Sequence, residues 1–351
     1  MSLKARLIRR IARLGPISVA DYMAECLFDP EHGYYATRDP LGHGGDFVTA
    51  PEISQMFGEL LGLWLAQVWM DQGQPKGILA ELGPGRGTLM ADILRATQAV
   101  PGFHDAMAVH LIEASPVLRR AQTETLAGRE VHHHDSIADL PEAPVFLVAN
   151  EFFDALPIRQ FQMSDVGDWQ ERQIGAEDGD LIWGLAPPAP LDVADTYTPG
   201  QIVETCAPAI AIAEEIGRRV ARHGGGALIV DYGDAVSRGD TFQAVAGHAY
   251  ADPLAAPGQA DLTAHVAFAP LAQAAAPAQA FGPIPQGVFL ERLGITGRAQ
   301  ALAKSLSGAA LDDHIAAHRR LTHPGEMGTL FKVLALLPAS AQRPPALEPP
   351  E

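Results

Sequence analysis

The stretch Glu81-Leu82-Gly83-Pro84-Gly85-Arg86-Gly87-Thr88 decides how this chain folds. It overlaps the end of a short apolar run at residues 78–82, which predicts a buried strand, and leads into residues 88–96, whose pattern predicts a helix. The three glycines permit backbone angles that other residues avoid and let the turn approach a ligand closely. Backbone N–H groups at the start of the helix would then face that ligand. The stretch therefore predicts a strand–turn–helix unit with a ligand-binding turn.

The spacing of the glycines indicates the class of ligand. A dinucleotide-binding turn has the pattern G-x-G-x-x-G and would need glycine at position 88, where this chain has Thr88. An acid followed by G-x-G-x-G is instead typical of methyltransferases that use S-adenosylmethionine (SAM). We therefore expect the cofactor SAM to contact Glu81, Gly83, Gly85 and Gly87. The alternative is a tight turn between strand and helix that binds no ligand.

Strands and helices alternate along the chain around this turn. Apolar runs predict the strands, and segments of helical pattern separate most of them. The expected strands lie at residues 78–82, 109–112, 131–134, 145–148, 227–230 and 329–336. Such alternation predicts an α/β fold with a parallel sheet and helices on both of its faces.

Two acids follow the second and third expected strands. Glu113 stands at the strand end where open α/β sheets bind ligands, and its carboxylate is suited to accept hydrogen bonds from both ribose hydroxyls of the cofactor. Asp135 is suited to accept from the adenine amino group. The alternatives are that Glu113 caps the helix beginning near Pro116 and that Asp135 is a surface acid beside Ser136.

The fourth expected strand ends in Asn150-Glu151-Phe152-Phe153-Asp154-Ala155-Leu156-Pro157. In this fold the end of that strand faces the methyl group to be transferred. We expect Asn150, Glu151 and Asp154 to be catalytic, because two acids three positions apart can orient a cationic nucleophile such as a guanidinium. The alternative for Asp154 is that it caps a turn.

Composition excludes several other classes of protein. The chain has 351 residues with 25 basic and 42 acidic side chains, and its net charge of −17 argues against a general nucleic-acid binder. Its two cysteines, Cys26 and Cys206, cannot form a disulfide framework. No uninterrupted apolar run reaches about 18 residues, so we expect no membrane span. His132, His133 and His134 would alternate between the faces of a strand, so we expect no metal site there.

Further helices are expected outside the alternating region. Residues 3–14 predict a basic amphipathic helix, for which a transit peptide is the alternative interpretation. Thr49 and Glu52 have the spacing of a capping box for a helix that runs to about Met70. Another helix is expected near residues 262–276.

We expect three parts in chain order. Residues 1–75 form a helical region that packs on the core, residues 76–337 form the core, and residues 338–351 form a flexible proline-rich tail. Two insertions interrupt the core, a hairpin at about 158–200 and a helical segment at about 285–322.

With these residues quoted, the chain resembles the MidA-like methyltransferases. This family includes a mitochondrial protein-arginine methyltransferase that assembles respiratory complex I. The resemblance covers residues 17 to about 337 and rests on several strings besides the two quoted above. These are Gly45-Asp46-Phe47-Val48-Thr49-Ala50-Pro51-Glu52-Ile53-Ser54, Asp231-Tyr232-Gly233, Gly239-Asp240-Thr241, Ala260-Asp261-Leu262-Thr263-Ala264-His265-Val266 and Met327-Gly328-Thr329-Leu330-Phe331-Lys332-Val333.

The resemblance implies a class I SAM-dependent methyltransferase with a Rossmann-like, seven-stranded sheet. It further implies methyl transfer to an arginine of a protein partner, with a respiratory complex I subunit as the expected substrate. Residues 46–52 are then expected to close over the cofactor, with Thr49 and Pro51 contacting it. Glu151, together with Asp154 and Glu52, is expected to hold the guanidinium.

Other functions compete with this one. The methyl acceptor could instead be a small molecule or another protein side chain, or the protein could bind SAM and act as an assembly chaperone. A nicotinamide-dependent dehydrogenase is disfavoured by Thr88. For location we expect the bacterial cytoplasm, or the mitochondrial matrix if the chain is eukaryotic.

Overall fold

The computed structural model describes residues 1–37, 48–191, 197–236 and 238–347, and the chain forms two compact units. The N-terminal unit comprises the described residues of 1–47, 154–209 and 236–265. The sheet unit comprises those of 48–153, 210–235 and 266–351. Each unit therefore collects three segments that are far apart in the sequence.

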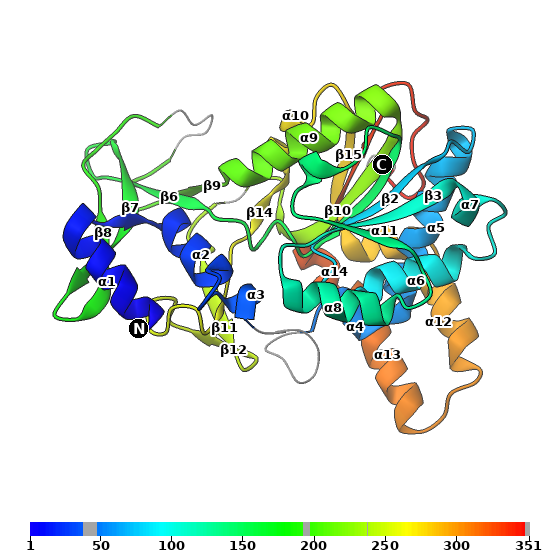
Figure 1. Ribbon diagram of the computed structural model, residues 1–351, viewed down its shortest axis with the longest axis horizontal. Helices are drawn as coiled ribbons and strands as arrows, with labels where there is room; N and C mark the ends of the chain where they lie inside the picture. The colour runs from blue at the N-terminus through cyan, green and yellow to red at the C-terminus, as the bar shows by residue number, and fades with distance from the viewer. Residues whose placement is uncertain (38–47, 192–196, 237, 348–351) are drawn as a thin grey trace. The chain divides into compact units, whose positions relative to one another are not determined.

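A mixed sheet forms the centre of the sheet unit (Figure 1). Its strand order is β15-β16-β10-β5-β2-β3-β4, and β14 also pairs with β10. Strands β2, β3, β4, β5 and β10 run parallel, whereas β16 is antiparallel to both β10 and β15. The α/β class is confirmed, and the seven strands of the main order agree with the expected seven-stranded sheet. The strands are β2 Gly77–Leu82, β3 Met107–Ile112, β4 Val131–His134, β5 Val145–Asn150, β10 Gly225–Asp234, β14 Val266–Ala267, β15 Gln279–Pro285 and β16 Phe331–Leu337.

The register brings the carboxyl ends of the central strands to one edge of the sheet. Leu82 at the end of β2 pairs with Ile112 of β3 on one side and with Ala149 of β5 on the other. Asn150 at the end of β5 pairs with Val230 of β10. Residues that directly follow these strands therefore lie close together, at the edge where open α/β sheets bind their ligands.

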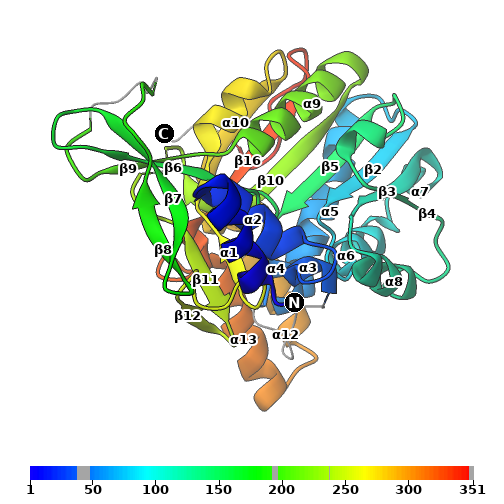
Figure 2. The ribbon, with the colours of Figure 1, turned by 60° about the vertical axis from the view of Figure 1, so that its left-hand side comes forward.

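Helices bury both faces of this sheet. Alternate strand residues such as Val148 and Val230 join α5 and α6 in one apolar core. Their neighbours Leu147 and Ile229 are fully buried on the opposite face, where Figures 1 and 2 show α9 and α10. The helices of the unit are α4 Ala50–Ile53, α5 Gln55–Asp71, α6 Thr88–Thr97, α7 Phe103–Ala106, α8 Pro116–Thr125, η1 Ile137–Asp139, α9 Ala207–His223, α10 Phe268–Ala274, α11 Gln286–Arg292, α12 Ile295–Ala303, α13 Ala309–Thr322 and α14 Met327–Leu330.

The long helix expected after Thr49 is interrupted at Ser54. The single turn α4 ends there, and α5 begins separately, with the Ser54 hydroxyl accepting a hydrogen bond from the Met56 amide at 3.3 Å. The predicted capping box is wrong, because the Thr49 side chain makes no capping hydrogen bond. Glu52 Oε1 instead accepts from the Thr88 hydroxyl at 2.6 Å. A tertiary donor has replaced the local one.

The helix expected near residues 262–276 begins only at Phe268. Its first expected turn is extended, because Asp261–Thr263 form strand β13 and pair with β11 (Gln243–Ala246). Local helical pattern is a weak constraint on a short segment, and pairing with a neighbouring strand overrides it here.

Residues 338–347, expected to be part of a flexible tail, pack on α5. Ala346 and Leu347 are buried in the core of the sheet unit, and the Pro345 carbonyl accepts a hydrogen bond from Trp64 Nε1 at 3.0 Å. Ala346 and Leu347 belong to the same apolar core as Trp64, and removal of their apolar surface from water favours this packing. Residues 348–351 of the expected tail lie outside the described residues.

The N-terminal unit combines helices with two small sheets. One sheet has the order β1-β7-β6-β9 with β8 on β7, and the other has the order β12-β11-β13. Its further elements are α1 Leu3–Leu14, β1 Ile17–Ser18, α2 Val19–Phe28, α3 Tyr34–Thr37, β6 Arg159–Met163, β7 Trp169–Glu177, β8 Asp180–Leu185, β9 Ile202–Thr205 and β12 Ala249–Ala251.

The basic N-terminal segment is a helix of this unit. Leu3, Leu7 and Ile11 of α1 are buried in the core of the N-terminal unit. On the more exposed side of the helix, Arg10 pairs with Glu25 of α2. The predicted amphipathic helix is confirmed, because its apolar stripe faces a core and its charged stripe meets an acidic neighbour.

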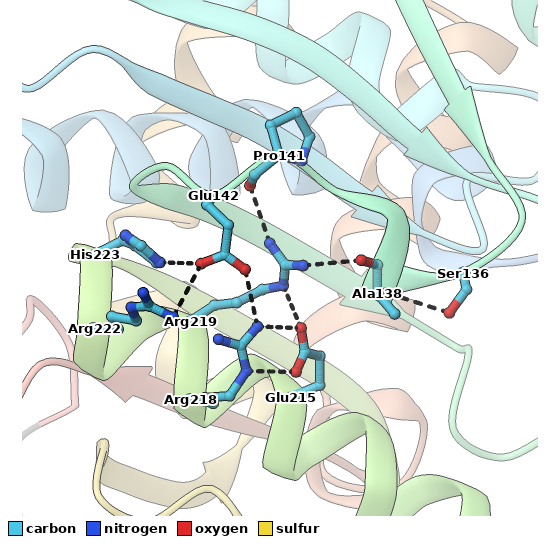
Figure 3. A network of polar contacts seen from close by, with 9 residues as sticks. All are labelled: Ser136, Ala138, Pro141, Glu142, Glu215, Arg218, Arg219, Arg222 and His223. Atoms are coloured by element: carbon cyan, nitrogen blue, oxygen red, sulfur yellow. Dashed lines mark hydrogen bonds and ion pairs between the residues drawn. The ribbon is translucent and has the colours of Figure 1, made fainter.

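A buried arginine ties α9 to the loop after β4 (Figure 3). Arg219 is only 2% exposed, and it donates to the carbonyls of Pro141 at 3.0 Å and Ala138 at 3.2 Å. Its Nε also pairs with Glu215 at 2.6 Å. An ion pair and hydrogen bonds from each guanidinium nitrogen make the burial of this charge tolerable. The loop held in this way begins next to Asp135, one of the expected site residues.

Arg219→Met should lower the free energy of unfolding by about 3 kcal/mol, because the carbonyls of Pro141 and Ala138 would lose this donor, while Glu215 would keep Arg218. Arg222→Met on the same helix is the matched control. Arg222 is 67% exposed and reaches Glu142 only at 3.7 Å, so its loss should cost at most about 0.5 kcal/mol. Urea denaturation measures both variants, and equal losses would contradict the structural role of Arg219.

Candidate active site

The glycine turn has the backbone that its sequence predicts. Gly83, Gly85 and Gly87 have φ of +62°, +51° and +84°, in the left-handed region that favours glycine. The Gly87 amide donates to the Pro84 carbonyl at 2.7 Å, which closes the turn just before α6. The Gly83 amide donates to the Ile112 carbonyl at 3.1 Å, so the turn is fixed to the end of β3. The start of a helix such as α6 favours a negatively charged or polar ligand group.

Glu81 is a buried acid at the beginning of this turn. It is 3% exposed, and within the described part of the chain its Oε2 has no hydrogen-bond partner. Burial raises the pKa of the Glu81 carboxyl to about 8, although the Met90 amide beside it acts in the opposite direction. A buried acceptor without a donor is costly. It is the kind of group that a ligand with an N–H donor would satisfy.

The raised pKa predicts how stability depends on pH. Below a pH of about 4.5 the Glu81 carboxyl is protonated in both folded and unfolded chains. Its contribution to the free energy of unfolding is therefore fully present there. As the pH rises towards about 8, the unfolded chain releases this proton and the folded chain keeps it. The free energy of unfolding should therefore fall, by roughly 1 kcal/mol per pH unit from this group.

Glu81→Gln should remove that dependence, because the amide does not titrate. The measurement is the difference in unfolding free energy between the two proteins, without SAM, at several values between about pH 5 and pH 8. Other titrating groups contribute equally to both proteins and cancel. Parallel pH profiles would show that Glu81 is not buried as described.

Glu113 directly follows β3, as the sequence predicts, and it has a hydrogen-bond partner, Gln122, that the sequence did not indicate. The Glu113 carboxylate accepts from the Ser115 amide at 2.7 Å, and burial raises its pKa. Gln122 of α8 is fully buried and donates to the Gly85 carbonyl at 2.7 Å and to Glu113 at 3.5 Å. One amide therefore joins the glycine turn to the expected ribose acid. Nothing distinguishes Gln122 from an ordinary helical residue in the sequence.

Asp135 is exposed and ion-paired. Its carboxylate lies 2.7 Å from Arg119 Nη2, and its side chain is 81% exposed. Arg119 Nε also donates to the Glu113 carbonyl at 2.6 Å. The same arginine thus connects the residues that follow β3 and β4, and it keeps Asp135 at the carboxyl edge of the sheet.

The histidines of β4 point alternately to two sides. His134 Nε2 is 2.8 Å from His110 Nδ1, and the His132 ring also packs on His110. His133 Nε2 is 2.9 Å from Gln122 Oε1 on the other side, which confirms the expected alternation. Burial lowers the pKa of His110 to about 4, so its ring is neutral at physiological pH. Across the described ranges, no group of three or more His, Cys, Asp or Glu side chains is arranged to hold a metal ion.

Asn150 and Glu151 lie together at the end of β5. The Glu151 Oε1 atom accepts hydrogen bonds from Asn150 Nδ2 at 3.0 Å and from the Ala50 amide at 2.8 Å. Glu151 has φ of +50°, an unusual value for a residue other than glycine. Asn150 is 7% exposed, and its Oδ1 has no partner among the described residues. Strained backbone and an unsatisfied acceptor often occur together at functional sites.

The segment expected to close over the cofactor is described only in part. Thr49 and Pro51 belong to the start of α4, and the amide of Ala50 between them reaches Glu151. Asp46 and the residue after it lie outside the described residues.

Asp231 is a further residue of this edge, and the sequence patterns alone assign it no role in the site. It is fully buried within β10, one residue after Val230, and its Oδ2 accepts from the Phe152 amide at 3.2 Å and the Phe153 amide at 2.9 Å. It therefore fixes the backbone directly after Glu151. The string Asp231-Tyr232-Gly233 was a signal, because it belongs to the family resemblance.

Asp154 is grouped with the N-terminal unit rather than with Glu151. It is 7% exposed, and its carbonyl accepts from the Ala264 amide at 3.0 Å. Within that unit the Tyr35 hydroxyl donates to Asp261 at 2.8 Å. Burial raises the pKa of Tyr35 well above its usual value, and the negative charges of Asp261 and Asp154 add to the shift. Asp154 therefore lies near a partly buried tyrosine and a second acid.

The residues at the carboxyl edge fit SAM in their chemistry. Glu81 offers a buried acceptor without a partner in the described part of the chain, and Glu113 offers a carboxylate that Gln122 joins to the glycine turn. SAM carries an ammonium group and ribose hydroxyls, which are donors to such acceptors. The turn itself presents backbone that only glycine allows to approach a ligand so closely.

Comparison with known proteins agrees with this chemistry. Residues 60–284 match the family described as "Putative S-adenosyl-L-methionine-dependent methyltransferase". Protein arginine methyltransferase NDUFAF7, mitochondrial, of Danio rerio is 39% identical, with 96% of this chain and 87% of that protein covered. The Homo sapiens protein of the same name is also 39% identical, with 95% of this chain and 82% of that protein covered. These names place the relatives in mitochondria and lend no support to the expected cytoplasmic location.

A solved structure has the same fold. A COG1565 superfamily protein from Burkholderia thailandensis, crystallised with S-adenosyl-homocysteine, is 29% identical with a TM-score of 0.80. The match covers 99% of this chain and 92% of that one. S-adenosyl-homocysteine is what remains of SAM after its methyl group has been transferred.

None of the helices in the described ranges is both long and apolar enough to cross a membrane.

Proposed function

Because this chain belongs to the S-adenosyl-L-methionine-dependent methyltransferase family that residues 60–284 match, we propose that it methylates an arginine side chain of a protein. The chain is a SAM-dependent methyltransferase. Bound SAM supplies a methyl group that its sulfonium already activates. The residues of the chain then have to position the acceptor nitrogen and take up its proton.

In this proposal the cofactor is held along the glycine turn. Glu81 and the three glycines hold its methionine part, Glu113 accepts from the ribose hydroxyls, and Asp135 lies beside the adenine. Thr49 and Pro51 complete the site from α4. Support comes from the φ angles of the glycines, from the unpaired Oε2 of Glu81 in the described part of the chain and from the link through Gln122.

One observation carries the choice of arginine as the acceptor. The Oδ1 of buried Asn150 has no donor among the described residues, and it stands beside the carboxylate of Glu151. A guanidinium is planar, carries five N–H donors and accepts no hydrogen bonds, so it can donate to both groups at once. The Glu151 carboxylate would orient the cation and take the proton that the nitrogen releases.

The second acid, Asp154, remains part of the proposal as a residue that binds the substrate cation. The printed name of the similar Danio rerio and human proteins, protein arginine methyltransferase, supports an arginine acceptor. The acidic balance of the chain also suits a basic partner, because a net charge of −17 attracts cationic segments. We propose a respiratory complex I subunit, or a similar protein, as that partner, in mitochondria or in a bacterium.

Transfer of labelled methyl groups tests the proposal. Tritiated SAM is incubated with a cell extract, with and without this protein, and labelled proteins are hydrolysed and analysed by mass spectrometry. We expect methylarginine in one or a few proteins, and the complex I subunits are examined first. Label on another side chain or on a small molecule would contradict the arginine assignment. Stable partner capture without any label would instead support an assembly chaperone.

A further inference from the structure

We propose that Thr88 and Glu52 are positioning residues that act on Glu151 through α4. This inference rests on the proposed role of Glu151 in holding the acceptor. The string that contains α4 is part of the family resemblance, and the cofactor and acceptor roles described above leave most of it unexplained. The position of α4 in the sheet unit suggests what this string does, because α4 contacts both α6, which follows the glycine turn, and Glu151, which follows β5.

At its first residue α4 holds the side chain of Glu151. The Ala50 amide is one of the donors that a helix leaves unpaired at its start, and it donates to Glu151 Oε1 at 2.8 Å. The Glu151 backbone is fixed separately, because its amide donates to the Val230 carbonyl at 2.9 Å. The side-chain direction of Glu151 therefore depends on Ala50 of α4 as well as on Asn150, whose Nδ2 donates to the same oxygen at 3.0 Å.

Two residues later α4 is joined to the cofactor turn. The Thr88 hydroxyl donates to Glu52 Oε1 at 2.6 Å. Thr88 is the first residue of α6 and directly follows Gly87, the last glycine of the turn. One turn of helix thus lies between the glycine turn and Glu151, with a hydrogen bond at each end.

Local structure contributes little to holding α4 in place. The helix has only four residues, and the Thr49 side chain gives it no cap. A single turn is unstable without tertiary contacts. Besides the bonds to Glu151 and Thr88, Ala50 is fully buried in the core of the sheet unit, and Arg320 donates to the carbonyl of Val48 at 3.3 Å. Apolar burial therefore keeps α4 on the core, and removal of the Thr88 hydroxyl should loosen its hydrogen-bonded turn, and with it the carboxylate of Glu151.

Thr88→Val tests this at constant shape, because it removes the hydroxyl and keeps the branched side chain. We expect amide exchange at Ala50 to quicken about fivefold, as for the loss of one ordinary hydrogen bond. We expect kcat for methyl transfer to fall about tenfold while the SAM dissociation constant changes less than about threefold. Thr88→Ser keeps the donor and should restore both values. Thr125→Val is the control, because Thr125 is an exposed threonine at the end of α8.

Glu52→Met removes the same bond from the other side and should reproduce the effect of Thr88→Val. The proposal is overturned if both variants exchange and turn over like Thr88→Ser, or if they weaken SAM binding as much as they slow transfer. Hydrogen exchange requires no methyl acceptor, so it tests the link from Thr88 through α4 to Glu151 even if the wild-type protein methylates no arginine. Absence of methylarginine in the wild-type reaction would count against the proposed function alone.

Discussion

Gly83→Val should weaken SAM binding by about a hundredfold, a loss of roughly 3 kcal/mol. Gly83 has φ of +62°, which a β-branched residue adopts only under strain. A Cβ atom at this position would also lie 2.7 Å from Cδ2 of Phe152, which is too close for two carbon atoms. Relief of either conflict requires movement of the turn or of the segment after Glu151.

Phe152 has little freedom to move away from that contact. Its amide donates to Asp231 Oδ2 at 3.2 Å, and its ring packs edge-on against Phe153, with 5.4 Å between ring centroids. We therefore expect the glycine turn to shift and the cofactor site to deform with it. The strain is local, so most of the cost should appear in SAM affinity.

Gly73→Val is the matched control for this substitution. Gly73 has φ of +81°, and a Cβ atom there would meet nothing within 4 Å. The control carries the backbone strain without the collision, in the loop after α5. Isothermal titration calorimetry gives the affinities, and circular dichroism checks that both variants fold. Unchanged SAM affinity in Gly83→Val would mean that the cofactor does not bind at this turn.

Glu151→Gln should slow methyl transfer by roughly a hundredfold or more and leave SAM affinity unchanged. The amide oxygen of glutamine can still accept from the Ala50 amide and from Asn150 Nδ2, the two donors that now meet at Glu151 Oε1. The local fold is therefore kept. What is lost is the negative charge that orients a guanidinium and accepts its proton.

Label transfer from tritiated SAM into protein, at saturating SAM, measures the effect. Glu214→Gln provides the comparison, because Glu214 is an exposed glutamate of α9. It loses one negative charge from the same unit without touching the carboxyl edge of the sheet. Equal rates for the two variants would rule out the role proposed for Glu151.

Much of the fold follows from local sequence. Apolar runs of strand length, separated by helical segments, predicted an α/β sheet, and the six expected strands overlap β2, β3, β4, β5, β10 and β16, whereas β15 was not expected. The glycine turn was predictable because three closely spaced glycines after a strand indicate backbone angles that most residues avoid. The structure has such φ angles at all three positions. Glu113 and Glu151 were identified because each acid directly follows a buried strand, and the carboxyl ends of parallel strands share one edge.

Side-chain partners far apart in the sequence were not predictable. The local pattern assigned Glu52 to a capping box with Thr49, but its oxygen accepts from Thr88, 36 residues away. Gln122 reaches the carbonyl of Gly85, 37 residues away, from a helix position that shows no special pattern. The grouping of three separate segments into each unit was equally invisible, because sequence patterns describe neighbours along the chain.

The sequence by itself determined the sheet, the glycine turn and the acids at the strand ends, since these depend on backbone preference and on burial of nearby residues. The tertiary structure decided which donors those acids meet. Ala50 and Glu151 are separated by 101 residues, and only the packing of α4 brings the amide of one to the carboxylate of the other. A hydrogen bond depends on distance and angle in space, and neither is encoded in the spacing of residues along a chain.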